Sequence, residues 1–338
     1  MKTFEPFAAG NMQLHNRIVM PPMCMYSADN SGRANDFHFT HYTARALGGA
    51  GLIIMEATGV VPNGRITDND LGLWDDAQAE GLGRIVDACH GYGAKMAIQL
   101  GHAGRKSETA GDRIDAPSAL AYSEKSRVPH ALEKGEIKAI AAAFAEAAGR
   151  ADRAGFDAVE IHGAHGYLIS EFLSGLANKR QDEYGGSTQN RARFLREVLE
   201  AVRGAWPAQK PILLRVSAED YLPGGMTPGE MGEIVRLVRP LIDVLHVSTG
   251  GVASAPIRPY PGYQVEAAAY LKKACDIPVI AVGLISEPDM AEEILNSGRA
   301  DLVALGRELL RNPQWPLLTA RRAGVEIPFP AQYRRAFL

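Results

Sequence analysis

Eight short apolar runs, each followed by a segment of helical pattern, constrain the fold of this chain more than any other feature. The runs are RIVM, GLIIME, AKMAIQL, DAVEI, PILLRVS, DVLHVS, IPVIAVG and ADLVALG. They are continuous and aliphatic, which is typical of strands covered on both faces. Eight β-then-α units with right-handed crossovers predict an α/β fold, a single (β/α)8 TIM barrel, with an open doubly wound sheet as the structural alternative.

The segments between the runs carry charges and alanines at helical spacing, including 76–90, 133–154, 189–203, 227–239 and 287–296. Ser187, Thr227 and Ser286 are predicted to cap three of these helices. Residues 101–134 are long, polar and interrupted by Pro117 and Pro129, which predicts an extended loop after the third strand. Loops at that end of a barrel carry functional sites.

Composition excludes several classes of function. A chain of 338 residues, 46% hydrophobic and 22% charged, can bury a large core, and its net charge of −3 favours neither nucleic acid nor an anionic membrane as partner. The amino-terminal residues lack the apolar core of a signal peptide, so we expect a cytoplasmic protein that acts on small molecules. Cys24, Cys89 and Cys275 form no C-x-x-C and are expected to be reduced thiols.

The stretch IHGAHGYL contains two histidines three residues apart and a tyrosine. His162 follows the strand DAVEI directly, so it is predicted to lie at a strand's carboxyl end, with His165 and Tyr167 in the same loop. On a helix this spacing would suit a metal, which makes a metal-dependent hydrolase the alternative. The first strand has no H-x-H and the later strands no well-placed Asp to complete such a site. A second pair, His38 and His41, is predicted to be structural.

Other strand ends also carry polar residues. Arg215 shares a face with Ser217 in PILLRVS and needs an anion, which is either a ligand or a neighbouring carboxylate such as Glu160. Gln99 ends the third strand, where its amide either satisfies loop backbone or binds the polar edge of a ring.

The last two units and the first strand add further candidates. Gly283, Gly306 and Arg307 follow strands seven and eight, where barrels bind phosphate, and Cys24 and Tyr26 lie just beyond strand one. Together, the strand ends offer a phosphate site, a cation, an amide, a thiol, imidazoles and phenols. This set favours a redox cofactor over hydrolysis.

The stretches PPMCMYS, HGAHGYLISEFLS, DEYGGSTQNRARF and ALGRELLRNP resemble the Old Yellow Enzyme flavoproteins, in particular the shorter bacterial ene-reductases. The likeness covers essentially the whole chain. It implies a (β/α)8 barrel that holds FMN non-covalently and uses NADPH as reductant. The implied reaction is reduction of activated C=C bonds of enones, nitroalkenes or quinones, by ping-pong hydride transfer. A flavin-binding protein without catalysis is the alternative from a different class.

The resemblance also implies roles for individual residues. Those that bind the flavin would be Pro21, Pro22, Met23, Cys24, Ala57, Gln99 and Arg215, with Gly283, Gly306 and Arg307 on its phosphate. The Cys24 thiol would tune the flavin, and Arg215 would stabilise its reduced anion. His162 and His165 would donate hydrogen bonds to a substrate carbonyl oxygen and Tyr167 would supply a proton, with Tyr26 as the other phenol at the substrate.

The C-terminal segment, about residues 325–338, resembles a tail that inserts an arginine into the neighbouring subunit's site. Arg335 in AQYRRAFL aligns with that arginine better than Arg334. The resemblance therefore implies a homodimer or homotetramer. The chain departs from the pattern at its end, where Phe337 is followed by Leu338.

Overall fold

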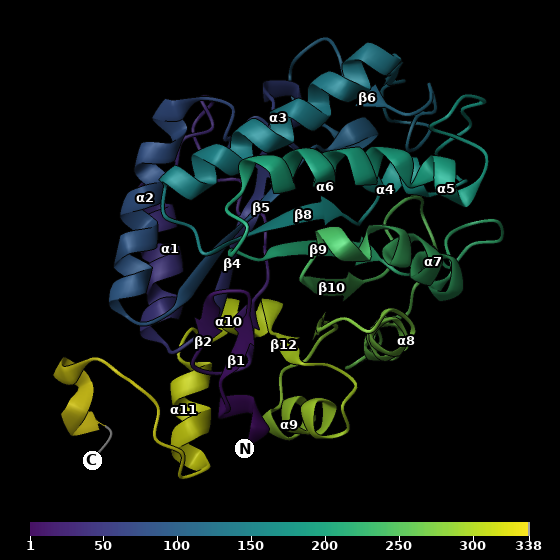
Figure 1. The fold of residues 1–338 in the computed structure, drawn as a ribbon. Helices are drawn as coiled ribbons and strands as arrows, with labels where there is room; N and C mark the ends of the chain where they lie inside the picture. Colours follow the sequence, from purple (N-terminus) through teal and green to yellow (C-terminus); the bar gives the residue numbers. More distant parts are fainter. Residues whose placement is uncertain (337–338) are drawn as a thin grey trace.

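The computed structural model describes residues 1–336, which form a closed barrel of eight parallel strands surrounded by helices (Figure 1). Hydrogen bonding runs around the barrel in chain order, and the last strand pairs with the first. The strands are β3 (Ile18–Met20), β4 (Leu52–Gly59), β5 (Lys95–Gly101), β8 (Ala158–Gly163), β9 (Ile212–Ser217), β10 (Val244–Ser248), β11 (Val279–Ala281) and β12 (Leu302–Ala304). The predicted (β/α)8 architecture is confirmed.

Helices cover the outside of this barrel (Figure 1). They are α1 (Asp36–Leu47), α2 (Asp76–Gly91), α3 (Lys134–Arg153), α4 (Leu168–Leu173), α5 (Thr188–Arg191), α6 (Arg193–Ala205), α7 (Pro228–Val238), α8 (Val265–Cys275), α9 (Pro288–Asn296), α10 (Gly306–Arg311) and α11 (Trp315–Arg322). Short 3-10 turns are η1 (Lys2–Phe4), η2 (Pro62–Gly64), η3 (Gly104–Lys106), η4 (Arg239–Leu241) and η5 (Ala331–Ala336).

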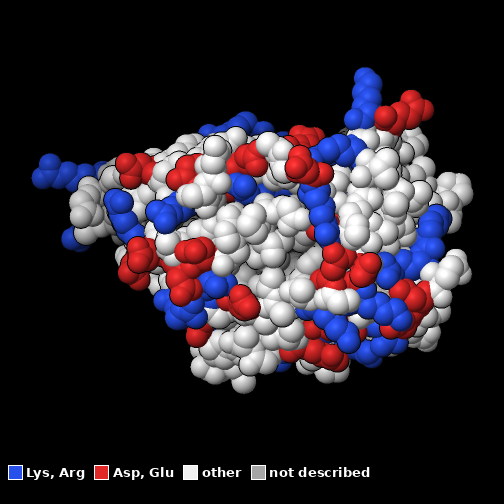
Figure 2. All heavy atoms as spheres, turned by 90° about the horizontal axis from the view of Figure 1, so that it is seen from above, with Lys and Arg blue, Asp and Glu red and all other residues white. Residues whose placement is uncertain are grey.

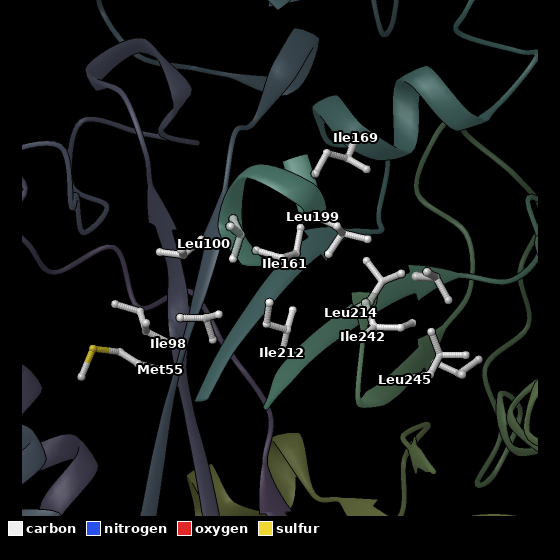
Figure 3. Packing of buried hydrophobic residues seen from close by; sticks show 14 of the residues in the cluster. Met55, Ile98, Leu100, Ile161, Ile169, Leu199, Ile212, Leu214, Ile242 and Leu245 are labelled. Atoms are coloured by element: carbon white, nitrogen blue, oxygen red, sulfur yellow. The ribbon is translucent and has the colours of Figure 1, made fainter. Parts of the chain in front are cut away.

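The apolar core has two parts because each strand is buried on both faces. Between strands and helices, residues such as Ile98, Ile161 and Leu214 pack against the inner faces of the helices (Figure 3). Inside the barrel, a smaller apolar cluster fills the amino-terminal half. Met12 and Leu14 of the hairpin formed by β1 (Phe7–Ala9) and β2 (Met12–Leu14) belong to this inner cluster, so the hairpin closes that end.

Two features of the predicted helices are wrong. The segment 189–203 contains α5 and α6, separated at Ala192, and not one continuous helix. Ser187 and Thr227 cap α5 and α7 as predicted, but α9 begins after Glu287, and Ser286 makes no cap hydrogen bond. Pro288 stands at the first turn of α9 and has no N–H to be capped, and the Ser286 carbonyl instead accepts from the Trp315 indole at 2.8 Å.

The extended loop after β5 contains ordered structure of its own. It begins with η3 and includes a small parallel sheet of β6 (Asp115–Ala116) and β7 (His130–Ala131) before α3 starts. The surface face in Figure 2 carries basic and acidic side chains interspersed, in keeping with the small net charge. Among the described residues, no helix is both long and apolar enough to cross a membrane.

Candidate active site at the carboxyl ends of the barrel strands

The β8 loop brings the two histidines and the tyrosine together. His162 is the second-last residue of β8, and its ring centroid lies 5.3 Å from that of His165 and 5.0 Å from that of Tyr167, both in edge-on contacts. The chain turns sharply here because His165 and Gly166 both have positive φ, +60° and +70°. A Cβ on Gly166 would lie 2.2 Å from the Gly251 carbonyl oxygen, so this turn requires glycine.

Each of the two imidazole rings has one hydrogen bond at a ring nitrogen, and the bond to His162 decides where the proton of that ring lies. The Ala164 N–H donates to His162 Nδ1 at 3.3 Å, which leaves Nε2 of that ring to carry the proton. His165 Nε2 lies 2.8 Å from Ser248 Oγ. Burial, together with the Arg215 charge, holds the pKa of both histidines well below the usual value. Both imidazoles are therefore neutral at pH 7.

Tyr167 keeps its proton in this site. Burial, with smaller contributions from Cys24 and Tyr26, raises the pKa of its phenol above the ordinary value. The Lys106 ammonium lies 5.0 Å from the centroid of the Tyr167 ring and donates to the His165 carbonyl at 2.9 Å. Lys106 thus joins the phenol to the backbone of the histidine loop. Lys106 could not be predicted from the sequence, because the short 3-10 turn η3 that carries it shows no periodicity.

The segment after β3 forms a second wall. Its residue Tyr26 has φ +52° and is 48% exposed, and its hydroxyl shares a hydrogen bond with the Cys24 thiol. Burial raises the pKa of both groups to about 12, so Cys24 is a thiol and Tyr26 a phenol at neutral pH. The Met25 N–H donates to the buried Glu56 carboxylate at 2.8 Å, which fixes the segment from behind.

A cavity of about 420 Å³ opens beside these residues. Its lining includes most of the candidates drawn from the first, fourth, fifth, seventh and eighth strand ends, namely Pro21, Pro22, Met23, His165, Arg215, Gly283, Gly306 and Arg307. A separate small hollow is lined by Ala57, His162 and Tyr167. The cavity is also lined by Ser248, Tyr263 and Gln264, which the sequence analysis missed. Ser248 shares a face with His246 on β10, so the alternation of side chains along this strand could have predicted it. No sequence pattern of this kind points to Gln264.

Arg215 extends from β9 toward this cavity and is only 7% exposed. The alternative of an ion pair with Glu160 is wrong, because Glu160 binds Gln99 Nε2 at 2.7 Å and His246 Nδ1 at 2.8 Å instead. Arg215 Nε is buried without a hydrogen-bond partner. A buried guanidinium in this state indicates an anionic or acceptor-rich ligand in the cavity.

Two predicted site residues line neither hollow and lie outside the wall formed after β3: Gln99 is buried against Glu160, and Arg335 lies on another part of the molecule. Arg335 is exposed in η5, and Figure 1 places this C-terminal segment beside α11, away from the side toward which β8 and β9 point. Phe337 and Leu338 lie outside the described residues. His38 and His41 lie on α1, with Nδ1 of each bonded within the helix or its cap, as predicted for structural residues. Among residues 1–336, no group of three or more His, Cys, Asp or Glu side chains is placed to hold a metal ion.

Comparison with known proteins identifies relatives that span the whole chain. Residues 2–322 match the NADH:flavin oxidoreductase / NADH oxidase family. An NADPH dehydrogenase of Clostridium acetobutylicum is 61% identical over 339 residues, which is 100% of both chains.

Solved structures agree with this relationship. Morphinone reductase superimposes with a TM-score of 0.82 at 30% identity, over 97% of this chain and 91% of that one. An old yellow enzyme homologue from Zymomonas mobilis gives a TM-score of 0.83 at 29% identity, over 96% and 94% of the two chains. A 2-naphthoyl-CoA reductase gives 0.90 at 27% identity over 96% of this chain, which spans about half (52%) of that longer protein.

These matches agree with the geometry of the cavity. FMN fits the residues present, because the cavity offers an unpartnered buried guanidinium, glycines at two strand ends and a further arginine, Arg307. The two alternative hypotheses, a metal-dependent hydrolase and a flavin-binding protein without catalysis, are therefore rejected in favour of a flavoenzyme. The chain belongs to the NADH:flavin oxidoreductase family, which includes the Old Yellow Enzymes, and it is an FMN-dependent oxidoreductase.

Proposed function

We propose that this enzyme uses NADPH to reduce activated C=C bonds of α,β-unsaturated carbonyl compounds, and also of nitroalkenes and quinones, in a ping-pong cycle. The observation that carries the proposal is the contact of two neutral imidazoles and one protonated phenol, His162, His165 and Tyr167, beside the cavity that Arg215 enters. The names of its relatives, NADPH dehydrogenase and morphinone reductase, agree with this chemistry.

The cofactor would occupy the cavity between β3 and the last two strands. When bound, FMN supplies hydride transfer from NADPH to the alkene. The residues that would hold its ring are Pro21, Pro22, Met23, Cys24, Ala57, Gln99 and Arg215, and those at its phosphate Gly283, Gly306 and Arg307. Arg215 would place its charge at the ring edge that becomes negative on reduction, which gives the buried guanidinium a partner.

The histidine pair would bind the substrate carbonyl. Negative charge develops on that oxygen as the β carbon is reduced, and preorganised N–H donors in a buried site stabilise it. His162 offers Nε2–H. If the Ser248 hydroxyl donates to His165 Nε2, the proton of that neutral ring lies on Nδ1, which becomes its donor. Neutral imidazoles suit this role because each ring already carries one N–H, so no proton has to be taken up from solvent before it can donate.

Tyr167 would protonate the α carbon. A buried phenol that stays protonated at pH 7 is a general acid with its proton always present. Tyr26, which is more exposed, would contact the substrate from the opposite wall. Cys24 would act as a neutral thiol near the ring that adjusts its potential and would not act as a nucleophile.

The experiment that tests this function separates the two half-reactions. Anaerobic stopped-flow mixing with NADPH should bleach the flavin absorbance, and 2-cyclohexenone should then restore it with formation of cyclohexanone. Reoxidation by oxygen without any reaction with enones, maleimides or nitroalkenes would reject the C=C reductase and leave only the flavin oxidoreductase.

We also propose that the tail, residues 325–338, lies at an interface between subunits, with Arg335 reaching a neighbouring site. Supporting this, Arg335 is exposed, and the C-terminal segment that carries it lies beside α11, away from the side toward which β8 and β9 point (Figure 1). Light scattering should show a dimer or tetramer, and Arg335→Ala should weaken enone binding without changing FMN content. A monomer with full enone activity would reject the proposal.

A further inference from the structure

A polar layer crosses the barrel interior directly above its apolar floor. The floor consists of inward residues on neighbouring strands, among them Ala97, Ala158, Leu213 and Val244. Two residues further along the same four strands stand Gln99, Glu160, Arg215 and His246, which therefore point to the same side. All four side chains are buried.

Glu160 is the centre of this layer. It is fully buried, and each carboxylate oxygen has one partner: Oε1 accepts from Gln99 Nε2 at 2.7 Å and Oε2 lies 2.8 Å from His246 Nδ1. Strands β8 and β10 do not pair with each other, since both flank β9. The bond between Glu160 and His246 therefore spans the barrel interior beneath the cavity.

We propose that Glu160 is a positioning residue for the FMN site, which sets the orientation of the Gln99 amide, fixes the tautomer of His246 and opposes the charge of Arg215. This inference rests on the proposed contacts of Gln99 and Arg215 with the flavin. It needs no assumption about which alkene is reduced.

The chemistry of a carboxylate leads to the first two parts. An ionised carboxylate only accepts hydrogen bonds, so Gln99 must turn its NH₂ group toward Glu160 and its carbonyl oxygen toward the other side. For the same reason His246 carries a proton on Nδ1. Its Nε2 is buried without a partner, and burial lowers the pKa of this ring, which leaves Nε2 without a proton. With its NH₂ group held by Glu160, Gln99 would turn its amide oxygen toward the flavin. That oxygen can accept a hydrogen bond only from a ring edge that carries an N–H.

Electrostatics leads to the third part. Glu160 is the one carboxylate among these four side chains, and Arg215 the one permanent cation. In a buried setting, opposite charges that are close but not in contact still attract each other, because little water screens them. Glu160 thus reduces the stabilisation that Arg215 can give to a reduced, anionic flavin. Removing the Glu160 charge should make the flavin easier to reduce.

The test uses the FMN-loaded full-length enzyme and its reduction potential against a reference dye, without NADPH or alkene. Glu160→Gln is expected to favour reduced FMN by about tenfold or more, a shift of about +30 mV for a two-electron couple. Asp157→Asn is the control for loss of a charge. Its carboxylate directly precedes β8, at the end of the barrel opposite the cavity, and lies 2.9 Å from Lys95 Nζ. The flavin potential of this variant should stay at the wild-type value. An unchanged or more negative potential for Glu160→Gln, or an equal shift in both variants, would overturn the proposal.

Two further measurements keep the test decisive if Glu160→Gln does not fold. Glu160→Asp keeps the charge but shortens the side chain, so the potential should stay near wild type while FMN binds several-fold more weakly. Nitrogen NMR of His246 in the FMN-loaded wild-type enzyme should show a protonated Nδ1 and an unprotonated Nε2, and the reverse tautomer would refute the assigned role of Glu160. Both results are independent of enone turnover, so a failed C=C reductase proposal would not mimic them.

Discussion

The chain contains two H-x-x-H pairs that look alike in sequence and differ in what surrounds them. His38 and His41 lie on α1, whereas His162 and His165 lie at the end of β8. Each pair even has a tyrosine edge-on to one ring, His41–Tyr42 with centroids 4.9 Å apart and His162–Tyr167 at 5.0 Å. The spacing of residues is therefore not what distinguishes a structural pair from a functional one.

Their partners make the difference. The α1 pair is held by its own helix, since His38 Nδ1 lies 3.1 Å from Asn35 Oδ1 at the cap and His41 Nδ1 lies 3.1 Å from Arg45 one turn on. Tyr42 donates to the buried Glu56 carboxylate at 2.9 Å. The β8 pair instead borders the two hollows. Among the described residues, the one side chain from another strand that bonds to a ring nitrogen of this pair is Ser248. Nε2 of His38 and of His41 is also buried without a hydrogen-bond partner, so incomplete bonding alone does not distinguish the pairs. The β8 pair is available for chemistry because it borders a hollow at a strand end.

Replacing the two tyrosines should give the largest contrast. Tyr167→Phe keeps the ring and removes the proton donor, so reoxidation of the enzyme by an enone should slow by about 10²- to 10⁴-fold while reduction by NADPH changes little. Stopped-flow absorbance measures both rates. Nitroalkenes should be affected less, because water can protonate their product later.

Tyr42→Phe is the matched control. It leaves a buried carboxylate short of one donor, which should lower the free energy of unfolding by about 1–3 kcal/mol without selecting one half-reaction. Equal slowing of both half-reactions by Tyr167→Phe would indicate a disturbed flavin site, and no slowing would make Tyr26 the next candidate acid.

Replacing the histidines should give the next largest effect. His162→Ala with His165→Ala removes both proposed donors, and loss of an oxyanion donor typically costs about 10²- to 10³-fold. We expect enone reduction to fall by at least that amount and phenolic ligands to bind more weakly, with FMN retained. His38→Ala with His41→Ala should leave enone kinetics near wild type and lower the melting temperature. If the double variant on α1 lost enone activity and the double variant at β8 only became less stable, the roles of the two pairs would be reversed.

Acid titration should show how much the histidine pair on α1 contributes to the stability of the fold. Burial lowers the pKa of His38 and of His41 to about 4 from the usual 6.5. The unfolded chain therefore binds these protons first, so their contribution to stability is full above pH 6.5 and is lost as the pH falls toward 4. Each accounts for up to about 3 kcal/mol. Urea unfolding at pH 7, 5.5 and 4.5 should show a smaller pH-dependent loss in His38→Gln with His41→Gln than in wild type.

The sequence was sufficient for the barrel because every strand is aliphatic and every crossover contains a helix. It was also sufficient to place three polar residues, His162, Arg215 and Gln99, at or near the carboxyl ends of such strands. It failed where position depends on irregular backbone or tertiary contact. Lys106 lies in η3, Gln264 precedes α8 without a pattern, and the three-residue strands of the β1–β2 hairpin are too short to show alternation.

Ser286 and Glu160 show a different reason. A serine before Pro288 satisfies the capping pattern, but the pattern does not report which residue the backbone places at the cap. The sequence favours Glu160 only as an ion-pair partner for Arg215, since the two residues lie on neighbouring strands. The register places Glu160 opposite Gln99 and Arg215 opposite His162 and His246, and this register is not encoded in either strand alone.

Ser248→Ala should give the smallest effect and the finest distinction between the pairs. Ser248 Oγ lies between His165 Nε2 and Gln264 Nε2, at 2.8 and 3.0 Å, so the hydroxyl both orients the imidazole and selects its tautomer. Gln264 keeps its bond to Thr249 at 2.9 Å when the serine is lost. One hydrogen bond contributes about 0.5–1.5 kcal/mol, which predicts a loss of about 2- to 12-fold in affinity for a phenolic ligand. Because Ser248 also lines the cavity, FMN affinity is measured separately by fluorescence, and the ligand titration is made at saturating FMN.

The comparable change on α1, Asn35→Ala, removes the cap contact of His38 and should alter stability without changing the affinity for the phenol. Unchanged phenol affinity in Ser248→Ala would mean that His165 needs no orientation from β10, and the β8 pair would then be as self-contained as the pair on α1.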